Sequence, residues 1–394
     1  MTDLVADLAE RVDRLLAEHP PQETDRWDFL RARYDAGLAW VHYPEGLGGL
    51  GRESAHQQAV DARLAAAGAP DNRPAGNVIG LGMAAPVIRT YATAEQQQSW
   101  LRPLWTGEEI WCQLFSEPGA GSDLAAAGAS ARRDGDAWVV NGQKVWTSLA
   151  HDARWALLLV RTDPTLPKHA GLSFFVLDML TAGVDVRPLR QMTGEAEFNE
   201  VYLDDVRVPD ANRLGEVGEG WRVTQATLMN ERVAIGGGVG DRESGAIADV
   251  ARRWRSEPSA RRPELHDELL RRWIDAESLR LASARFAQKA EAGTPGPDGS
   301  GLKLAFATLA QETSSLSVAL DGAEGLRYDD WSLRRPDFSN PEQRVSGFDY
   351  LRTRANSIEG GTSEVLRSII SERVLGLPAE PRVDKDIPWK DLAK

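Results

Sequence analysis

The chain has 394 residues, and its 46 lysines and arginines against 59 aspartates and glutamates give a net charge of −13. This length predicts two or three domains, and a composition of 42% hydrophobic and 27% charged residues is typical of a soluble globular protein. The acidic balance disfavours nucleic-acid partners and a polybasic membrane anchor, because both need a basic surface.

The cysteine content and the uncharged segments indicate in which cellular compartment the protein is expected. The single cysteine, Cys112, excludes an intramolecular disulfide and a thiolate zinc cluster, and it fits a reducing cytoplasm. Residues 1–20 mix acidic and basic side chains with their apolar positions, unlike a signal peptide. The longest uncharged stretch, residues 75–88, contains glycines and Pro86 and is too short to span a bilayer. We therefore expect a cytoplasmic protein with no membrane partner.

The N-terminal part of the chain has the periodicity of helices. Leu4, Leu8 and Val12 recur at helical spacing, and further helical segments surround residues 55–67 and 95–105.

From about residue 109 to residue 209 the pattern becomes strand-like. Asn141-Gly142 lies between two apolar runs and predicts a hairpin turn at that point. Short apolar runs with turn residues between them follow at residues 155–162, 172–179, 184–189 and 201–208. This pattern predicts an antiparallel β domain.

Helical periodicity returns after Gly220 and continues to a last helix over residues 363–375, which Gly376 ends. A polar Pro/Gly loop at residues 293–301 separates two long helices. The layout predicts an α+β protein with a helical domain (1–112), a β domain (113–222) and a C-terminal helical domain (223–394).

Three chemical motifs have simpler structural explanations. Residues 46–51 match G-x-G-x-x-G, but no βαβ unit surrounds them, so a tight glycine turn is favoured over a dinucleotide site. The six histidines include no pair at i, i+4, so we expect no metal site. Cys112 lies in an apolar run and is interpreted as a buried small residue rather than a nucleophile.

Residues 113–123 turn abruptly from apolar to small and polar. Their glycines, hydroxyls and backbone amides could approach a flat polar ring or a phosphate closely, although an ordinary loop has the same composition. Trp146, followed by Thr147 and Ser148, suits stacking on an aromatic cofactor with donors to its edge. The alternative for Trp146 is a tryptophan in the core.

Two further segments combine charge or glycine with a helix. Glu231 follows Leu228 and precedes Ile235 at i, i+3, i+7, so it shares an apolar stripe, where lost solvation raises the pKa of a carboxyl group. The alternative is a carboxylate paired with Arg232 or Arg222. Residues 358–364 place two glycines directly before a helix N-terminus, which favours an electron-rich ligand or forms a simple turn capped by Thr362.

These four segments, in this order and at these separations, resemble the acyl-CoA dehydrogenase family over nearly the whole chain. Further matching segments are residues 44–51, 141–146, 198–209 and 218–221, with Asn212 and Gly215. The resemblance implies a helical N-terminal domain, a β middle domain and a C-terminal four-helix bundle, with FAD between the last two domains. It also implies a dimer or tetramer of like or unlike chains, and electron transfer to an electron-transfer flavoprotein.

The resemblance also implies site residues. Those along the flavin are Gln113, Phe115, Ser116, Gly121, Ser122, Trp146, Thr147, Ser148, Thr362 and Glu364. Ser122 and Arg232 are the implied substrate contacts. In this family a carboxylate removes the α-proton of an acyl-CoA thioester while the β-hydrogen leaves as hydride to flavin N5, and a backbone amide helps to bind the thioester oxygen.

The placement of the base departs from the commonest family pattern. Many members carry it as a Glu directly before Gly-Thr, where this chain has Gly360. A minority, including the isovaleryl- and long-chain-type enzymes, use the Glu of a segment that Asn230-Glu231-Arg232 matches. Resemblance and helix periodicity therefore both indicate Glu231 as the base, with the Gly360 amide facing the thioester oxygen.

The chain also lacks the family's Arg-x-x-Phe-Gly segment at the flavin pyrophosphate, and only residues 319–323 faintly echo Gln-x-x-Gly-Gly. Two alternatives to the dehydrogenase follow: a flavin-dependent monooxygenase on the same fold, and a flavin-poor partner subunit of a heteromeric enzyme. The acyl group, and whether CoA or a carrier protein bears it, stay open.

Overall fold

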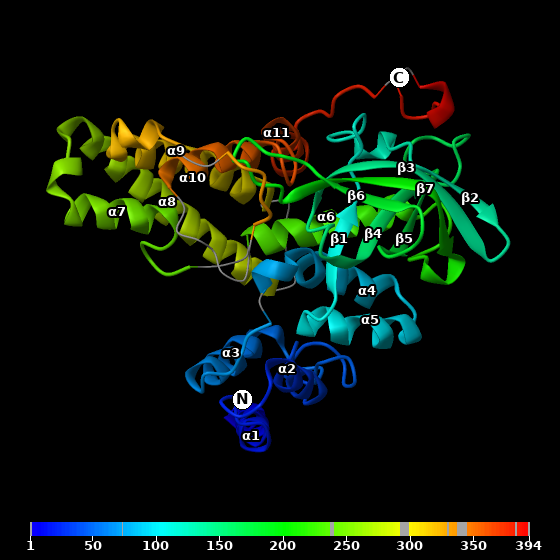
Figure 1. Cartoon of the computed structure of the whole chain (residues 1–394), viewed down its shortest axis with the longest axis horizontal. Helices are drawn as coiled ribbons and strands as arrows, with labels where there is room; N and C mark the ends of the chain where they lie inside the picture. Colours follow the sequence, from blue (N-terminus) through cyan, green and yellow to red (C-terminus); the bar gives the residue numbers. More distant parts are fainter. Residues whose placement is uncertain are drawn as a thin grey trace.

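The computed structural model describes residues 2–72, 74–236, 240–291, 299–328, 331–336, 345–382 and 384–392, without the side chains of residues 2–6, 74–75, 231–236, 260 and 290–291. In chain order it consists of a helical region, a seven-stranded sheet and a second helical region. Figure 1 shows the sheet with the N-terminal helices below it and the C-terminal helices beside it.

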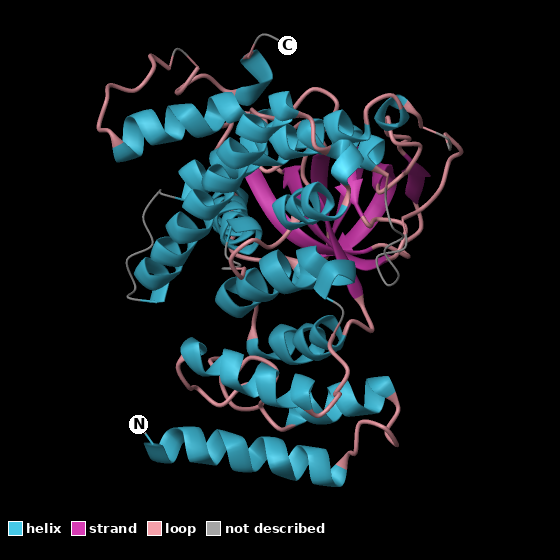
Figure 2. Ribbon diagram, turned by 90° about the vertical axis from the view of Figure 1, so that its left-hand side faces the viewer, coloured by secondary structure: helices cyan, strands magenta, loops and turns pink. Residues whose placement is uncertain are grey.

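Five α-helices form the N-terminal region: α1 (Thr2–Glu18), α2 (Arg26–Asp35), α3 (Gln57–Ala66), α4 (Ala85–Tyr91) and α5 (Ala94–Thr106). The first three share a core of their own around Phe29 and Val60, and Figure 2 shows α1 at the end of the molecule farthest from the sheet. Helix α5 begins at a capping box of Thr93 and Gln96. It packs Trp100 onto Trp111 and Trp155, which joins this region to the sheet.

Residues 46–51 form the glycine turn that the sequence predicted. Gly46, Gly48 and Gly51 have positive φ angles. A Cβ on Gly49 would lie 2.1 Å from the Tyr43 carbonyl oxygen, so only glycine fits this approach.

The strands are β1 (Ile110–Leu114), β2 (Ser130–Asp134), β3 (Ala137–Ser148), β4 (Ala153–Arg161), β5 (Leu172–Asp178), β6 (Val184–Pro188) and β7 (Phe198–Pro209). They lie in the order β1-β4-β2-β3-β7-β6, with β5 on β4. The prediction of a purely antiparallel sheet was wrong, because β1 and β4 pair in parallel. The β2–β3 hairpin intervenes between them, so the chain returns to β4 in the direction in which it left β1.

The hairpin predicted at Asn141-Gly142 was also wrong, since β3 runs straight through both residues. The tight turn lies earlier, at Gly135 between β2 and β3, with a φ of +66°. Gly142 allows close packing rather than a turn, because a Cβ on it would lie 2.5 Å from the Cβ of Ala129. Pairing with β2 and β7 on both edges of β3 outweighs the local turn preference of Asn-Gly.

Both faces of the sheet are buried along β4. Leu157 and Leu159 join the core beneath helices α4 and α5, whereas Leu158 and Val160 join a second core on the opposite face. This explains the continuous apolar run at β4 in place of strict alternation. Cys112 is fully buried in the second core, as predicted.

The C-terminal helices are α6 (Gly220–Gly236), α7 (Ala246–Ser256), α8 (Pro263–Glu291), α9 (Gly299–Asp321), α10 (Ser346–Thr353) and α11 (Ser363–Ile369). Helix α9 is central and packs against the other five. Helix α11 continues as one π-helical segment, Ile370–Val374, and Gly376 follows with a φ of +67°. The predicted fold class, a helical N-terminal domain, a β middle domain and a C-terminal helical bundle, is confirmed.

The end of the chain returns to the sheet, where Figure 1 shows it above β3. The Trp389 indole donates to the Ala126 carbonyl at 2.9 Å, and Lys168 lies 2.6 Å from Asp384. Across the described residues, none of the helices combines the length and apolar character needed to cross a membrane.

Candidate active site

A buried ion pair fixes the loop that follows β1. The Lys144 ammonium donates to the Phe115 carbonyl at 3.0 Å and lies 2.7 Å from the Glu117 carboxylate. Glu117 also accepts hydrogen bonds from the amides of Gly128 and Ala129. Burial lowers the pKa of Lys144, and the neighbouring Glu117 opposes that shift. The start of the 115–123 loop is therefore held by charge-assisted hydrogen bonds inside the β domain.

Trp146 stands out on β3 because its backbone is strained and its side chain is exposed. Its φ is +59°, a conformation that bulky residues rarely adopt, and 60% of its surface is accessible. The ring contacts Phe198 edge to face at 5.9 Å. The alternative of a core tryptophan was therefore wrong. An exposed aromatic ring on strained backbone points to a functional surface.

Two of the predicted flavin residues have a buried side-chain oxygen without a hydrogen-bond partner within the described part of the chain: Gln113 Oε1 on β1, and Thr147 Oγ1 on β3, next to Trp146 in the sequence. The Thr147 carbonyl is satisfied by the Asn199 side chain at 2.9 Å. Buried polar groups left without partners are costly. Each of the two atoms therefore leaves a hydrogen-bonding position that a bound ligand would fill.

The other predicted residues on this side differ in what they expose. The Phe115 ring is buried against Phe174, so only its backbone faces the loop. The Ser116 carbonyl accepts from the Val145 amide at 2.9 Å. Gly121 and Ser122 are exposed on the loop, and Ser148 is half-buried at the end of β3.

The predicted site has two sides: a β wall, formed by residues 113–122 and Trp146, and a helical wall, formed by residues 359–364. The helical wall contains the turn before α11. Gly360 and Gly361 have φ angles of +63° and +95°, and the Thr362 hydroxyl accepts from the Val365 amide at 3.2 Å as the helix N-cap. Glu364 is exposed. On α9 the buried Lys303 donates to the Gly361 carbonyl at 2.6 Å and to the Asn356 carbonyl at 2.8 Å.

Arg352 on α10 joins the two walls. Its guanidinium lies 5.6 Å from the ring of Phe198, the neighbour of Trp146. It also pairs with Glu359, directly before Gly360, at 3.1 Å, and with Glu197, near the start of β7, at 3.2 Å. Segments that are more than 150 residues apart along the sequence are thereby brought to one place.

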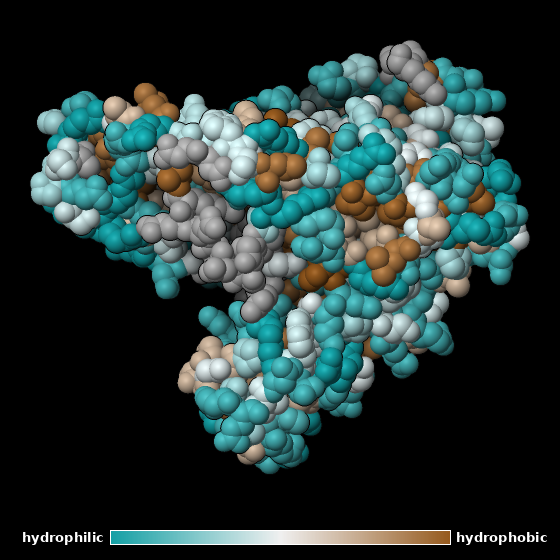
Figure 3. Space-filling view, viewed as in Figure 1, coloured by the Kyte–Doolittle hydropathy of each residue, from teal (hydrophilic) through white to brown (hydrophobic). Residues whose placement is uncertain are grey.

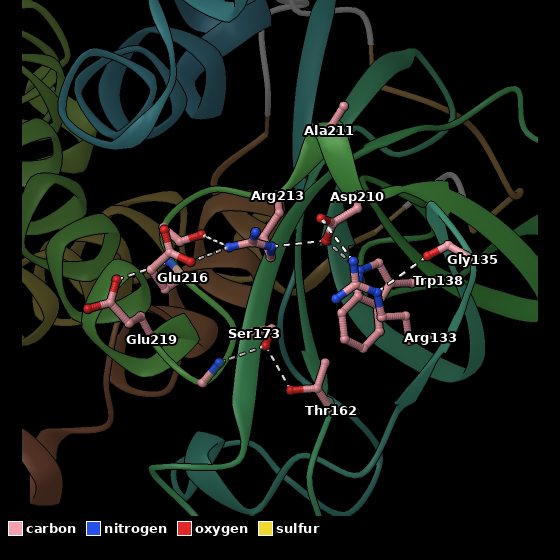
Figure 4. Close-up of polar contacts among 12 residues, drawn as sticks. Arg133, Gly135, Trp138, Thr162, Ser173, Asp210, Ala211, Arg213, Glu216 and Glu219 are labelled. Carbon is pink, nitrogen blue, oxygen red and sulfur yellow. Dashed lines mark hydrogen bonds and ion pairs between the residues drawn. The ribbon is translucent and has the colours of Figure 1, made fainter.

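A polar network fixes the connection from β7 to α6 (Figure 4). Asp210 accepts from the Trp138 indole at 2.7 Å and from Arg213 at 3.1 Å. The Ser173 hydroxyl accepts from the Gly218 amide at 3.0 Å. A Cβ on Gly220 would lie 2.6 Å from the Ser173 backbone, so α6 begins in close contact with β5.

Helix α6 carries the predicted base. Its buried face includes Thr224 and Thr227, and the helical repeat places position 231 in line with them. The side chains of Glu231 and Arg232 themselves lie outside the described residues. Arg222, one of the partners considered for Glu231, pairs with Glu219 at 2.8 Å.

Lys144, Lys303 and Arg352 were not among the residues that the sequence motifs predicted for the site. Lys144 belongs to the matched segment 141–146, and a lysine among the apolar residues of a strand was the available signal. Arg352 and Lys303 carry no local signal for these links, because Glu197 and Gly361 lie 155 and 58 residues away from them.

Three family models match the chain: the acyl-CoA dehydrogenase N-terminal domain at residues 1–108, the middle domain at 112–206 and the C-terminal domain at 218–375. The chain is 38% identical to acyl-CoA dehydrogenase IpdE1 of Mycobacterium tuberculosis, over 88% of this chain and 86% of that protein. It is 39% identical to FadE34 of the same organism over 87% of this chain, which corresponds to only 45% of FadE34.

Solved structures agree with this assignment. The Tcur3481-Tcur3483 steroid ACAD has a TM-score of 0.72 at 25% identity and covers 96% of this chain and 99% of its own. The ChsE4-ChsE5 complex from Mycobacterium tuberculosis has a TM-score of 0.68 at 28% identity and covers 96% and 98%.

FAD is the cofactor of this family, and the residues present here fit it. The exposed Trp146 ring offers a stacking face, and Gln113 Oε1 and Thr147 Oγ1 are the buried acceptors that a polar ring edge would satisfy. The chain belongs to the acyl-CoA dehydrogenase family, whose members are FAD-dependent oxidoreductases acting on acyl-CoA thioesters.

Proposed function

We propose that this protein catalyses the α,β-dehydrogenation of an acyl-CoA thioester, with Glu231 removing the α-proton and an electron-transfer flavoprotein receiving the electrons. The observation that carries the proposal is the convergence of the Trp146 surface and the Gly360 turn through Arg352. FAD held between them would supply the acceptor for the β-hydrogen and its electron pair.

Gly360 and Glu231 have the two other roles in the proposed reaction, which are binding of the thioester oxygen and removal of the α-proton. The Gly360 amide binds the thioester oxygen, where negative charge develops as the α-proton leaves. Glu231 takes that proton from the face of the substrate opposite the flavin. Glu359 is the competing carboxylate, but its pairing with Arg352 engages it as a structural anion.

The substrate class that we propose is a CoA thioester with a bulky, ring-containing acyl group. Gly360 leaves the position of the commonest base without a side chain, which frees volume beside the α-carbon. The likeness to the Tcur3481-Tcur3483 steroid ACAD supports the same class.

We further propose that the working enzyme contains a second chain of the same family. This chain lacks the pyrophosphate segment Arg-x-x-Phe-Gly. FadE34 matches it over less than half of its own length, and two of the similar structures are named as pairs of chains.

The surface also supports a partner chain. Exposed apolar side chains lie along α8, at Leu270, Ile274 and Leu281. A groove of 950 Å³ opens between α8, α9 and α11, with Phe286 and Ile370 among its lining residues. Figure 3 shows a mostly hydrophilic surface over the N-terminal helices and clusters of apolar residues nearer the middle of the same face. Exposed apolar patches of this kind are typical of interaction sites.

The flavin content of the purified protein tests the first requirement of the proposed function, which is that the protein binds FAD. We expect the chain, alone or with a family partner from the same source, to purify with one FAD per active site. A protein that stays colourless after FAD addition in both forms would overturn the dehydrogenase assignment.

A further inference from the structure

Arg352 is a side chain that links the two walls of the site. Its side chain is 23% exposed, and its partners Glu197 and Glu359 are 17% and 35% exposed. Glu197 precedes β7 in the β domain, whereas Glu359 precedes Gly360 in the helical domain. One cation therefore forms ion pairs with two carboxylates that come from different domains.

We propose that Arg352 is a positioning residue that sets the spacing between Trp146 and the Gly360 turn and keeps Glu359 away from the thioester. The inference rests on the proposed function, because it concerns the same acyl-CoA and FAD site. It goes beyond that function in assigning a task to a residue that does not itself touch the reacting atoms.

The contact with the β wall is made through an aromatic ring. The guanidinium lies 5.6 Å from the Phe198 centroid, and the Phe198 ring meets Trp146 at 82°. A guanidinium near an aromatic ring is attracted by its electron density. Arg352 therefore restrains Phe198, and Phe198 limits how far the exposed Trp146 ring can turn.

The contact with the helical wall is electrostatic. Without Arg352, Glu197 and Glu359 would repel each other, and Glu195 adds to the negative charge near Glu197. Burial already raises the pKa of Glu197, and Arg352 counteracts that rise. Loss of the arginine would drive Glu359 away from Glu197 and move the adjoining Gly360 with it.

The experiment compares Arg352→Gln and Arg352→Lys with Arg354→Gln in the holoenzyme, including its partner chain if one is needed. Arg354 is a matched control, because its side chain contacts Gln311, Ser314 and Tyr350 within the helical domain alone. The readouts are the Kd for FAD, the fluorescence of bound flavin, and kcat and KM for the thioester.

We expect Arg352→Gln to weaken FAD binding about tenfold and to increase the fluorescence of bound flavin, because stacking on Trp146 is loosened. Arg352→Lys keeps the charge but loses the planar fork, so it should fall between wild type and Arg352→Gln. Arg354→Gln should leave both flavin readouts within twofold of wild type.

Adding Glu359→Gln to Arg352→Gln removes the released charge and should recover part of the lost FAD affinity and kcat. A scaffold role alone would show no such recovery. Glu197→Gln, which leaves Arg352 in place, guards against a misfolded Arg352 variant and should increase flavin fluorescence by itself.

Unchanged flavin affinity and fluorescence in Arg352→Gln and Glu197→Gln would overturn the inference. So would equal effects of Arg352→Gln and Arg354→Gln. The flavin readouts need no substrate turnover, so they remain informative if no acyl thioester reduces the wild-type flavin, an outcome that would count against the proposed function instead.

Discussion

The two walls of the site are built differently. The β wall, from Gln113 to Ser122 and at Trp146, is held inside its own domain by the buried Lys144–Glu117 pair. The helical wall, from Glu359 to Glu364, is a glycine turn whose backbone is restrained by two long side chains, Lys303 and Arg352, that reach it from α9 and α10. The β wall is therefore built into the sheet, whereas the helical wall depends on how distant elements dock.

The C-terminal segment strengthens this contrast. Lys168 lies 2.6 Å from both Asp123, at the end of the 115–123 loop, and Asp384 in the tail. The 115–123 loop is therefore held by an ion pair near each of its ends, Lys144–Glu117 and Lys168–Asp123. Local stability follows the density of such contacts, so we expect variation in substrate and base placement to concentrate on the helical wall.

The largest expected effect comes from removing the proposed base, Glu231. Glu231→Gln keeps the size and hydrogen bonding of the side chain but cannot accept the α-proton. Flavin reduction by the thioester should fall by at least about 100-fold, with FAD and thioester binding retained. Stopped-flow absorbance measures the rate. Glu359→Gln is the control and should be mild; a reversed result would assign the base to Glu359.

The second effect is on the stability of the β wall. Lys144→Met leaves Glu117 buried without its cation and should lower the free energy of unfolding by about 3–5 kcal/mol. Denaturant unfolding measures this loss, and the exposed Lys390→Met should change it little. An unchanged midpoint for Lys144→Met would show that the pair does not hold the loop.

Lys303 tests the helical wall in the same way. Lys303→Met removes the donor to the Gly361 carbonyl, and hydrogen bonds from charged groups contribute about 1.5–3 kcal/mol. FAD affinity should fall roughly tenfold while the unfolding of the β domain is unaffected. Titration of the apoprotein with FAD measures the change. A loss of the same size on both measurements would contradict the division between the walls.

Trp146→Ala should have a smaller effect. Aromatic pairs contribute about 0.5–1.5 kcal/mol, so FAD retention should weaken by about two- to tenfold. Apoprotein stability should hold, because the ring is 60% exposed and alanine keeps the same Cβ on the positive-φ backbone. Equilibrium dialysis with FAD distinguishes this from a core role, in which stability would fall and retention would not.

Cys112 gives the smallest expected signal. Burial raises the pKa of its thiol, so the thiolate is not formed near neutral pH. The native protein should not react with a chromogenic disulfide reagent until it is unfolded. Rapid reaction of the folded protein would restore Cys112 as a candidate nucleophile.

Local sequence patterns predicted the three regions and the glycine turn at residues 46–51, because these depend on residues close along the chain. The assignment of the two wall segments to a flavin and thioester site stays a prediction. Local patterns failed at Asn141-Gly142, where pairing on both edges of β3 overrides a turn preference. The links from Arg352 to Glu197 and from Lys303 to Gly361 span 155 and 58 residues. No local pattern encodes these contacts, since the first arises from docking of the β and helical domains and the second from packing of α9 against the turn before α11. The cytoplasmic location stays a prediction.

The most direct test of the account is an anaerobic titration of the FAD-loaded protein with a panel of acyl-CoA thioesters, followed by flavin absorbance. The panel runs from straight short chains to ring-containing acyl groups and includes carrier-protein thioesters. We predict that a bulky acyl-CoA bleaches the flavin stoichiometrically and that Glu231→Gln abolishes the rapid bleaching. A flavin that no thioester reduces, or equal bleaching of Glu231→Gln and wild type, would contradict the account.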